Sequence, residues 1–76
     1  MNKIKSFGQV KEVIGAEYTI DDSYETVSDL KELLNKKFPV IQWSSVAVAL
    51  NKKYASGEDK IEPNDEIALI PPVSGG

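Results

Sequence analysis

The stretch that decides the fold is residues 26–39, which read TVSDLKELLNKKFP. Its apolar residues recur at helical spacing, at Val27, Leu30, Leu33, Leu34 and Phe38. This period predicts one amphipathic helix over residues 27–38. Thr26 is a favourable N-cap, Asp29 puts a negative charge in the first turn, and Pro39 ends the helix.

Before this helix, two short strands and a short helix are predicted. Residues 4–7 and 17–21 have the alternation of strands. Between them, residues 9–14 predict a short helix that ends at Gly15. We expect this helix to pack through Val10, Val13 and Ile14, which share one helical face.

After the helix, residues 45–51 and 66–70 alternate as strands do. Residues 40–45 are read as a loop, residues 51–54 as a tight turn and residues 56–60 as a polar loop. The chain is therefore predicted to be α+β, with a mixed sheet of about four to five strands packed on one main helix. We expect the first and last strands to be neighbours at the centre of the sheet. This is the β-grasp (ubiquitin-like) arrangement, although the order of elements also allows a ferredoxin-like sandwich.

The composition limits the chemistry of the chain. Its 76 residues form one domain and contain neither Cys nor His, and all nine basic residues are lysines. Without a thiol or an imidazole, the chain lacks the usual nucleophile, general base and metal ligands, which argues against a self-contained enzyme. A net charge of −3 argues against binding to nucleic acid or to an anionic membrane.

Other features of the sequence bear on location and metals. The N-terminus lacks the apolar run of a signal peptide, and no stretch has transmembrane length, so a cytoplasmic protein is predicted. An acidic cluster does not have the spacing of an EF-hand and is read as a solvated loop, so no metal site is expected. The cluster comprises Glu58, Asp59, Glu62, Asp65 and Glu66.

The last six residues, PPVSGG, carry no charged side chain. Pro71 and Pro72 cannot continue a sheet, so residues 1–70 are predicted to form the domain and residues 71–76 an extended, flexible tail. A tail of this length reaches about 20 Å, enough to enter a pocket on another protein. Gly75 and Gly76 suit a narrow channel because they have no Cβ, and they leave the terminal carboxylate open to attack. Terminal glycines alone could equally be a frayed end.

Four segments of the sequence resemble one known family: residues 7–15 (FGQVKEVIG), residues 26–30 (TVxxL), residues 48–51 (VALN) and residues 65–76 (DEIALIPPVSGG). Together they resemble the small subunit of molybdopterin synthase, a ubiquitin-like sulfur carrier of the MoaD type within the MoaD/ThiS family. The resemblance covers essentially the whole chain, and its last twelve residues are the most specific part. Members of the family usually have Arg where this chain has Lys11, and Lys cannot make the bidentate contacts of Arg.

The resemblance implies a subunit that is not catalytic alone within a sulfurtransferase complex. An E1-like activating enzyme of the MoeB type would use ATP to adenylate the Gly76 carboxylate, and sulfur would then replace an oxygen to give a thiocarboxylate. Pro71, Pro72, Val73, Ser74 and Gly75 would insert into the large (MoaE-type) subunit. There the sulfur would pass to cyclic pyranopterin monophosphate for molybdenum cofactor biosynthesis. The family assembly is a heterotetramer, and no cofactor is expected to bind this chain alone.

The resemblance also implies a docking surface that contains Phe7, Tyr54 and Ile70. From its charge, Lys11 is expected to face an acidic patch of the partner. The alternative is that Phe7 and Ile70 fill the core and that Lys11 is only solvated. Three other functions fit a Gly-Gly tail: a thiamine-pathway sulfur carrier, a ubiquitin-like protein modifier, and an interaction module with an inert tail. Pro71 and Pro72 favour the molybdopterin branch.

Overall fold

The computed structural model describes residues 2–20 and 22–72. Its elements, in order, are β1 (Ile4–Ser6), α1 (Gly8–Ile14), β2 (Glu17–Tyr18), α2 (Val27–Lys37), the 3-10 helix η1 (Trp43–Ser45), β3 (Ala47–Leu50), β4 (Lys53–Ala55) and β5 (Ile67–Ile70). The two predicted helices and the four predicted strands are confirmed, most with slightly shorter bounds.

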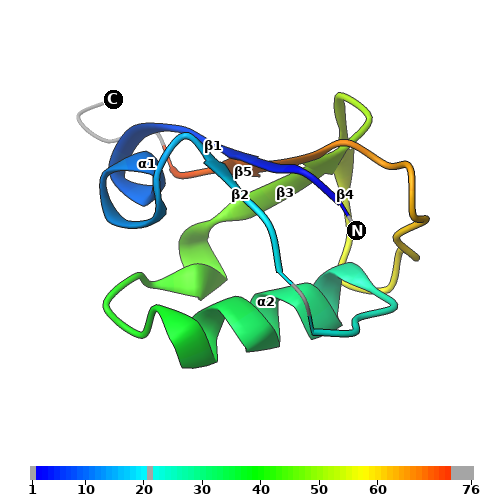
Figure 1. The fold of residues 1–76 in the computed structure, drawn as a ribbon, viewed down its shortest axis with the longest axis horizontal. Coiled ribbons are helices and arrows are strands. Elements are labelled where there is room, and N and C mark those ends of the chain that lie inside the picture. The colour runs from blue at the N-terminus through cyan, green and yellow to red at the C-terminus, as the bar shows by residue number, and fades with distance from the viewer. Residues whose placement is uncertain (1, 21, 73–76) are drawn as a thin grey trace.

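The strands form one mixed sheet in the order β2-β1-β5-β3-β4. The first and last strands, β1 and β5, are parallel neighbours at its centre, as predicted, while the other pairs are antiparallel. Helix α2 lies across one face of this sheet, and α1 lies at the end where β5 finishes (Figure 1). This confirms the α+β prediction.

The start of α2 is fixed by a reciprocal capping box. Oγ1 of Thr26 accepts a hydrogen bond from the N–H of Asp29, and Oδ2 of Asp29 accepts one from the N–H of Thr26, both at 3.2 Å. Such a pair satisfies two backbone donors that the first turn of a helix leaves free. The predicted N-cap is therefore confirmed.

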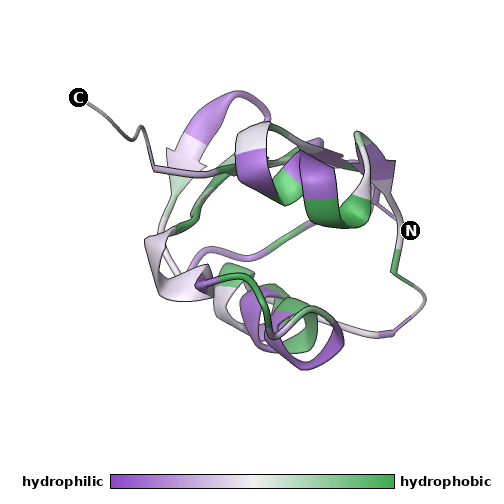
Figure 2. Ribbon diagram, turned by 90° about the vertical axis from the view of Figure 1, so that its left-hand side faces the viewer, coloured by the Kyte–Doolittle hydropathy of each residue, from purple (hydrophilic) through white to green (hydrophobic). Residues whose placement is uncertain are grey.

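The core fills the space between α2 and the inner face of the sheet. Leu30 and Leu34 of α2 and Ile67 and Leu69 of β5 are fully buried. Burial of each such side chain contributes about 1.5–3 kcal/mol. Both helices carry hydrophobic and hydrophilic stretches, as expected of helices that each pack one side against a core (Figure 2). Because side chains alternate along a strand, Ala68 and Ile70 of β5 lie on the face of the sheet away from α2.

Three predictions about local structure were wrong. Residues 51–54 are not one turn, because the turn occupies only Asn51 and Lys52, and β4 begins at Lys53. Residues 40–45 contain η1, which forms because the indole of Trp43 is buried and its Nε1 donates to the carbonyl oxygen of Phe38 at 2.9 Å. Val13 does not pack into the core: its side chain is 43% exposed.

The strand predicted over residues 17–21 is also shorter than expected. Only Glu17 and Tyr18 pair with β1, and Asp21 lies outside the described residues. The chain then turns toward α2, with Ile20 buried in the core. Burial of Ile20 thus takes the place of further strand pairing.

Candidate functional site: the tail root and the outer sheet face

The C-terminal segment leaves the domain from the central strand. β5 ends at Ile70, which pairs with Ala47 of β3. Pro71 is half-buried and Pro72 is exposed, and neither has an N–H with which to extend the ladder. The described chain thus leaves the sheet at the end of its central strand, beside α1 (Figure 1). The other predicted tail residues, Val73, Ser74, Gly75 and Gly76, lie outside the described residues.

We define the outer face as the sheet surface opposite α2, formed by Ala47, Ala49, Tyr54, Ala68 and Ile70. The register places Ala49 between Ala68 and Tyr54, and Ala47 beside Ile70. Three of these five side chains are single methyl groups. They make an apolar floor with little side-chain bulk, in which Ala49 itself is only 5% exposed. Ile70 joins this floor directly to the tail.

Two aromatic side chains stand out from this region. Tyr54 is 76% exposed on β4, and Phe7 is 50% exposed at the N-cap of α1. Phe7 keeps an extended backbone, with φ −136° and ψ 160°, directly after Ser6, whose register partner is Leu69. The alternative in which Phe7 fills the core is therefore wrong. Ile70 is half-buried and faces away from α2, so it also lies outside the main core.

The fourth predicted docking residue, Lys11, lies near Phe7 on α1. Both line a shallow hollow of about 340 Å³ between α1 and the strands β1 and β2. The Lys11 side chain is exposed. The fold therefore brings Lys11 and Phe7 to the same hollow, while Tyr54 lies across the sheet on β4.

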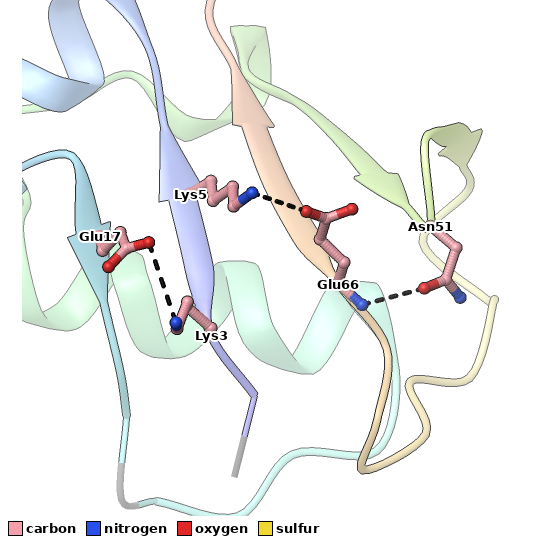
Figure 3. A network of polar contacts seen from close by, with 5 residues as sticks. All are labelled: Lys3, Lys5, Glu17, Asn51 and Glu66. Atoms are coloured by element: carbon pink, nitrogen blue, oxygen red, sulfur yellow. Dashed lines mark hydrogen bonds and ion pairs between the residues drawn. The ribbon is translucent and has the colours of Figure 1, made fainter.

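A polar region adjoins the outer face at the end where β5 begins (Figure 3). Lys5 Nζ lies 2.8 Å from a carboxylate oxygen of Glu66, and Lys3 Nζ lies 4.0 Å from one of Glu17. The hydrogen bond to Glu66, together with its charge, raises the pKa of Lys5, and the same contacts lower the pKa of Glu66. Asn51 supports this end by accepting a hydrogen bond from the N–H of Glu66 at 3.0 Å. The sheet is thus charged where β5 starts and apolar where β5 ends at the tail.

Two acidic side chains of the predicted solvated cluster accept hydrogen bonds from backbone N–H groups within turns. Oδ2 of Asp59 accepts from the N–H of Ser56, and Oδ2 of Asp65 accepts from the N–H of Glu62, each at 2.8 Å. Within residues 2–20 and 22–72, no three His, Cys, Asp or Glu side chains gather in a way that could hold a metal ion. The described part of the chain contains no helix that is long and apolar enough to cross a membrane.

Two features were not predicted from the sequence: the alanine floor and a groove beside Pro71 and Pro72. The alternation of residues 45–51 and 66–70 already put Ala47, Ala49 and Ala68 on one face, but small side chains gave no sign of a docking surface. The groove has a volume of about 330 Å³ and is lined by Val13, Val40, Pro71 and Pro72, among others. Val13 and Val40 come from segments far apart in the sequence, so no local pattern could have joined them.

The comparisons with known proteins agree with this geometry. A model of the ThiS family matches residues 4–76. The chain belongs to the ThiS family. Its predicted resemblance to sulfur carriers of the MoaD/ThiS type is confirmed at this level.

One curated relative and two solved structures are similar to this chain over nearly its whole length. The molybdopterin synthase sulfur carrier subunit of Dictyostelium discoideum is 40% identical over 97% of this chain and 94% of its own length. SAMP1 of Haloferax volcanii is 28% identical, with a TM-score of 0.78 over 99% of this chain and 98% of that one. A chain in the complex of subunits 1 and 2 of the molybdopterin-converting factor from Helicobacter pylori is 27% identical. Its TM-score is 0.70, over 99% of this chain and 97% of that one. These neighbours confirm the β-grasp fold.

Proposed function

We propose that this chain is the sulfur carrier subunit of a molybdopterin synthase and that its Gly76 carboxylate is the group that carries sulfur. An activating enzyme uses ATP to form an acyl-adenylate at Gly76. Sulfide from a sulfur donor then attacks the activated carbonyl carbon, and AMP leaves with one of the original carboxylate oxygens. The resulting thiocarboxylate donates its sulfur to cyclic pyranopterin monophosphate in the large subunit.

The observation that carries this proposal is the exit of the central strand. β5 is held on both sides by β1 and β3, so its last residue, Ile70, has a fixed position. Pro71 and Pro72 then lead the chain off the sheet beside an apolar surface. A rigid platform with a terminal Gly75-Gly76 that the family model also covers is what a carrier needs. The similarity to the sulfur carrier subunit of Dictyostelium discoideum gives independent support.

The outer face supports a partner that covers the sheet while it receives the tail. Large apolar or aromatic anchors in interface cores carry much of the binding free energy, and Tyr54 and Phe7 are exposed side chains of this kind. We infer that Tyr54, Phe7 and Ile70 contact the large subunit and that Lys11 meets an acidic group at the edge of that contact. The existence of a two-subunit complex in Helicobacter pylori supports such a partner.

The chain itself supplies little of the chemistry. It has no Cys to hold a persulfide and no His to transfer protons near neutral pH. The sulfur therefore reaches this chain during activation by the E1-like enzyme, and the large subunit transfers the protons. The carrier contributes a carboxylate and a surface, and we expect it to act in the cytoplasm.

Intact mass spectrometry tests the proposal. The chain is incubated with ATP, a sulfide donor and an activating enzyme of the MoeB type. We expect the mass to rise by the difference between sulfur and oxygen, and we expect no change in a variant that lacks Gly76. If the wild-type chain keeps its original mass while a known carrier is converted in the same mixture, the proposal fails.

The similarity to SAMP1, a small archaeal modifier protein, favours a second function. In that case the activated Gly76 carboxylate forms isopeptide bonds with lysines of other proteins. The same incubation in a cell extract separates the two functions, because a modifier gives covalent adducts of higher mass. Rescue of a cell that lacks its molybdopterin carrier, but not of one that lacks its thiamine carrier, separates the two sulfur-carrier pathways.

A further inference from the structure

Two residues far apart in the sequence meet at the root of the tail. Gly8 is the first residue of α1, and Pro71 is the first residue after β5. A Cβ built on Gly8 would lie 2.9 Å from Cγ of Pro71, which is closer than real Cβ atoms approach other heavy atoms. The pyrrolidine ring therefore occupies the space that any other residue at position 8 would need.

The parallel pairing of the central strands brings these residues together. Ser6 of β1 is the register partner of Leu69 of β5. Gly8 and Pro71 each lie two residues beyond this pair, so the chain leaves the same end of the sheet at both positions. Gly8 has φ +55°, a left-handed conformation in which it turns the chain into α1. Glycine thus meets two needs at this position, one of conformation and one of space.

A groove also borders the root of the tail. Pro71 and Pro72 line the groove of about 330 Å³, together with Val13 of α1 and the exposed Val40. The ring of Pro71 is therefore in close contact with Gly8, and the groove leaves space into which the ring could move. Proline fixes its own φ and restricts the residue before it, so the seat of this ring determines the path of the chain.

We propose that Gly8 is a positioning residue for the C-terminal tail. Its bare Cα seats the ring of Pro71 and so sets the direction in which the chain leaves the domain toward the activating enzyme. This inference rests on the proposed function. A Cβ at position 8 displaces the ring, and the tail then samples directions that do not enter the partner.

A matched pair of substitutions separates positioning from stability. Gly15, at the other end of α1, also has a positive φ, of +91°, but a Cβ there would meet only the carbonyl oxygen of Glu17, at 3.9 Å. Gly8→Ala and Gly15→Ala therefore both strain the backbone, and only Gly8→Ala disturbs Pro71. Urea unfolding of each variant shows how much stability each has lost.

The readout is the rate of thiocarboxylate formation at increasing concentrations of the chain. If only a fraction of the tails point correctly, the apparent affinity falls by that fraction, while the bound complex reacts normally. We expect Gly8→Ala to raise KM by about tenfold, corresponding to about a tenth of competent tails, with kcat nearly unchanged. Gly15→Ala should keep the wild-type KM. Equal values of KM for the two variants would overturn the inference.

Pro71→Ala gives a second test, and its first measurement, on the single variant, does not require Gly8→Ala to fold. Removal of the ring should itself raise KM, and Gly8→Ala should then add nothing in the Pro71→Ala background, because the two residues act through one contact. The same fold-increase in both backgrounds would contradict the proposal. So would the absence of a nuclear Overhauser effect between the Gly8 Hα and Pro71 Hγ protons of the free wild-type chain. If the wild-type chain is never loaded with sulfur, the proposed function fails instead.

Discussion

The hydroxyl of Tyr24 donates a hydrogen bond to Oδ1 of Asn2 at 2.8 Å, so the segment before α2 is joined to the start of the chain. The side-chain nitrogen of Asn2 donates in turn to the carbonyl oxygens of Glu62, Pro63 and Asp65 at 2.8, 3.2 and 2.9 Å. Asn2 is only 5% exposed. It therefore holds together the start of β1 and the turn that leads into β5, the strand that presents the tail.

Asn2→Asp should destabilise the protein strongly although it changes little in size. The substitution replaces the donating NH₂ with a carboxylate oxygen, which then faces three carbonyl oxygens. We expect the free energy of unfolding to fall by about 3 kcal/mol, because that oxygen of a buried charged group would be left without a donor. Urea denaturation near neutral pH measures this loss.

Two controls belong to this experiment. Tyr24→Phe removes one neutral hydrogen bond and should cost only about 1 kcal/mol. Asn64→Asp makes the same chemical change at an exposed position of the neighbouring turn and should stay within about 0.5 kcal/mol of the wild type. Equal losses for Asn2→Asp and Asn64→Asp would contradict the role of Asn2.

Ser6 is a buried polar residue whose removal should stabilise the fold. It is 3% exposed, and its Oγ has no hydrogen-bond partner among the described residues. Ser6→Ala removes that hydroxyl and keeps the small side chain, so we expect a gain of about 1 kcal/mol in the free energy of unfolding. Ser44→Ala, at an exposed serine, should change it by less than about 0.5 kcal/mol. A loss of stability in Ser6→Ala would mean that the hydroxyl has a partner after all.

Asp65 should make stability depend on pH in the acid range. The N–H of Glu62 and then the side chain of Asn51 donate to its carboxylate, and these bonds lower the pKa of Asp65 below its ordinary value of 3.8. The folded state therefore favours the charged form. The charged Asp65 carboxylate contributes its full stabilisation above the pKa that Asp65 has in the unfolded state. This stabilisation is lost as the pH falls through the pKa that Asp65 has in the folded state.

Urea denaturation between about pH 6 and pH 2 measures this dependence. Asp65→Asn should lose stability less steeply than the wild type as the solution is acidified. Asn51→Gly removes one of the two donors and keeps a residue that tolerates the positive φ there, so its slope should be intermediate. An unchanged slope in Asp65→Asn would show that other carboxylates dominate.

Tyr54→Ala should weaken binding to the large subunit without destabilising the carrier. Its side chain is 76% exposed, so its removal should hardly affect unfolding. Because Tyr54 is proposed as an aromatic anchor, its removal should cost about 2 kcal/mol of binding free energy, or roughly thirtyfold in Kd. Isothermal titration calorimetry with the large subunit measures this, and Lys36→Ala on the exposed side of α2 is the control. Equal Kd values for both variants would show that the outer face is not part of the interface.

The sequence predicted those parts of the fold that depend on local signals. The apolar period and the Thr26 cap identified α2 to within one residue at its end, because both act within a few residues of each other. The central place of β1 and β5 was also predicted, since a mixed sheet packed on one helix favours it. The end of β5 before Pro71 could be predicted because proline has no N–H for the ladder of a central strand.

The missed features depend on contacts between distant segments. Nothing near Gly8 in the sequence indicates that Pro71 lies on it, because the parallel register of two strands creates that contact. Val13 has the spacing of a core residue, but it borders the groove, since the core beneath α1 is already filled by Val10. Strand β4 was missed for a different reason, which concerns the turn before it.

That turn lacks the residue that usually marks a hairpin. Asn51 and Lys52 have φ values of +53° and +71°, as the two central residues of a type I′ turn require, and glycine is strongly preferred at the second position. A non-glycine residue in the left-handed conformation costs about 1–2 kcal/mol, whereas glycine adds flexibility to the unfolded chain. Lys52→Gly should therefore give a net gain of about 0.5–1 kcal/mol in the free energy of unfolding.

The neighbouring lysine supplies a matched control for this last substitution. Lys53 is the first residue of β4 and pairs with Leu50, so Lys53→Gly should lose about 0.5–1 kcal/mol. Both variants remove one lysine charge from adjacent positions, and a general effect of charge would therefore change both in the same direction. Opposite signs in urea denaturation would establish that the backbone conformation of Lys52 strains this hairpin, and equal signs would contradict it.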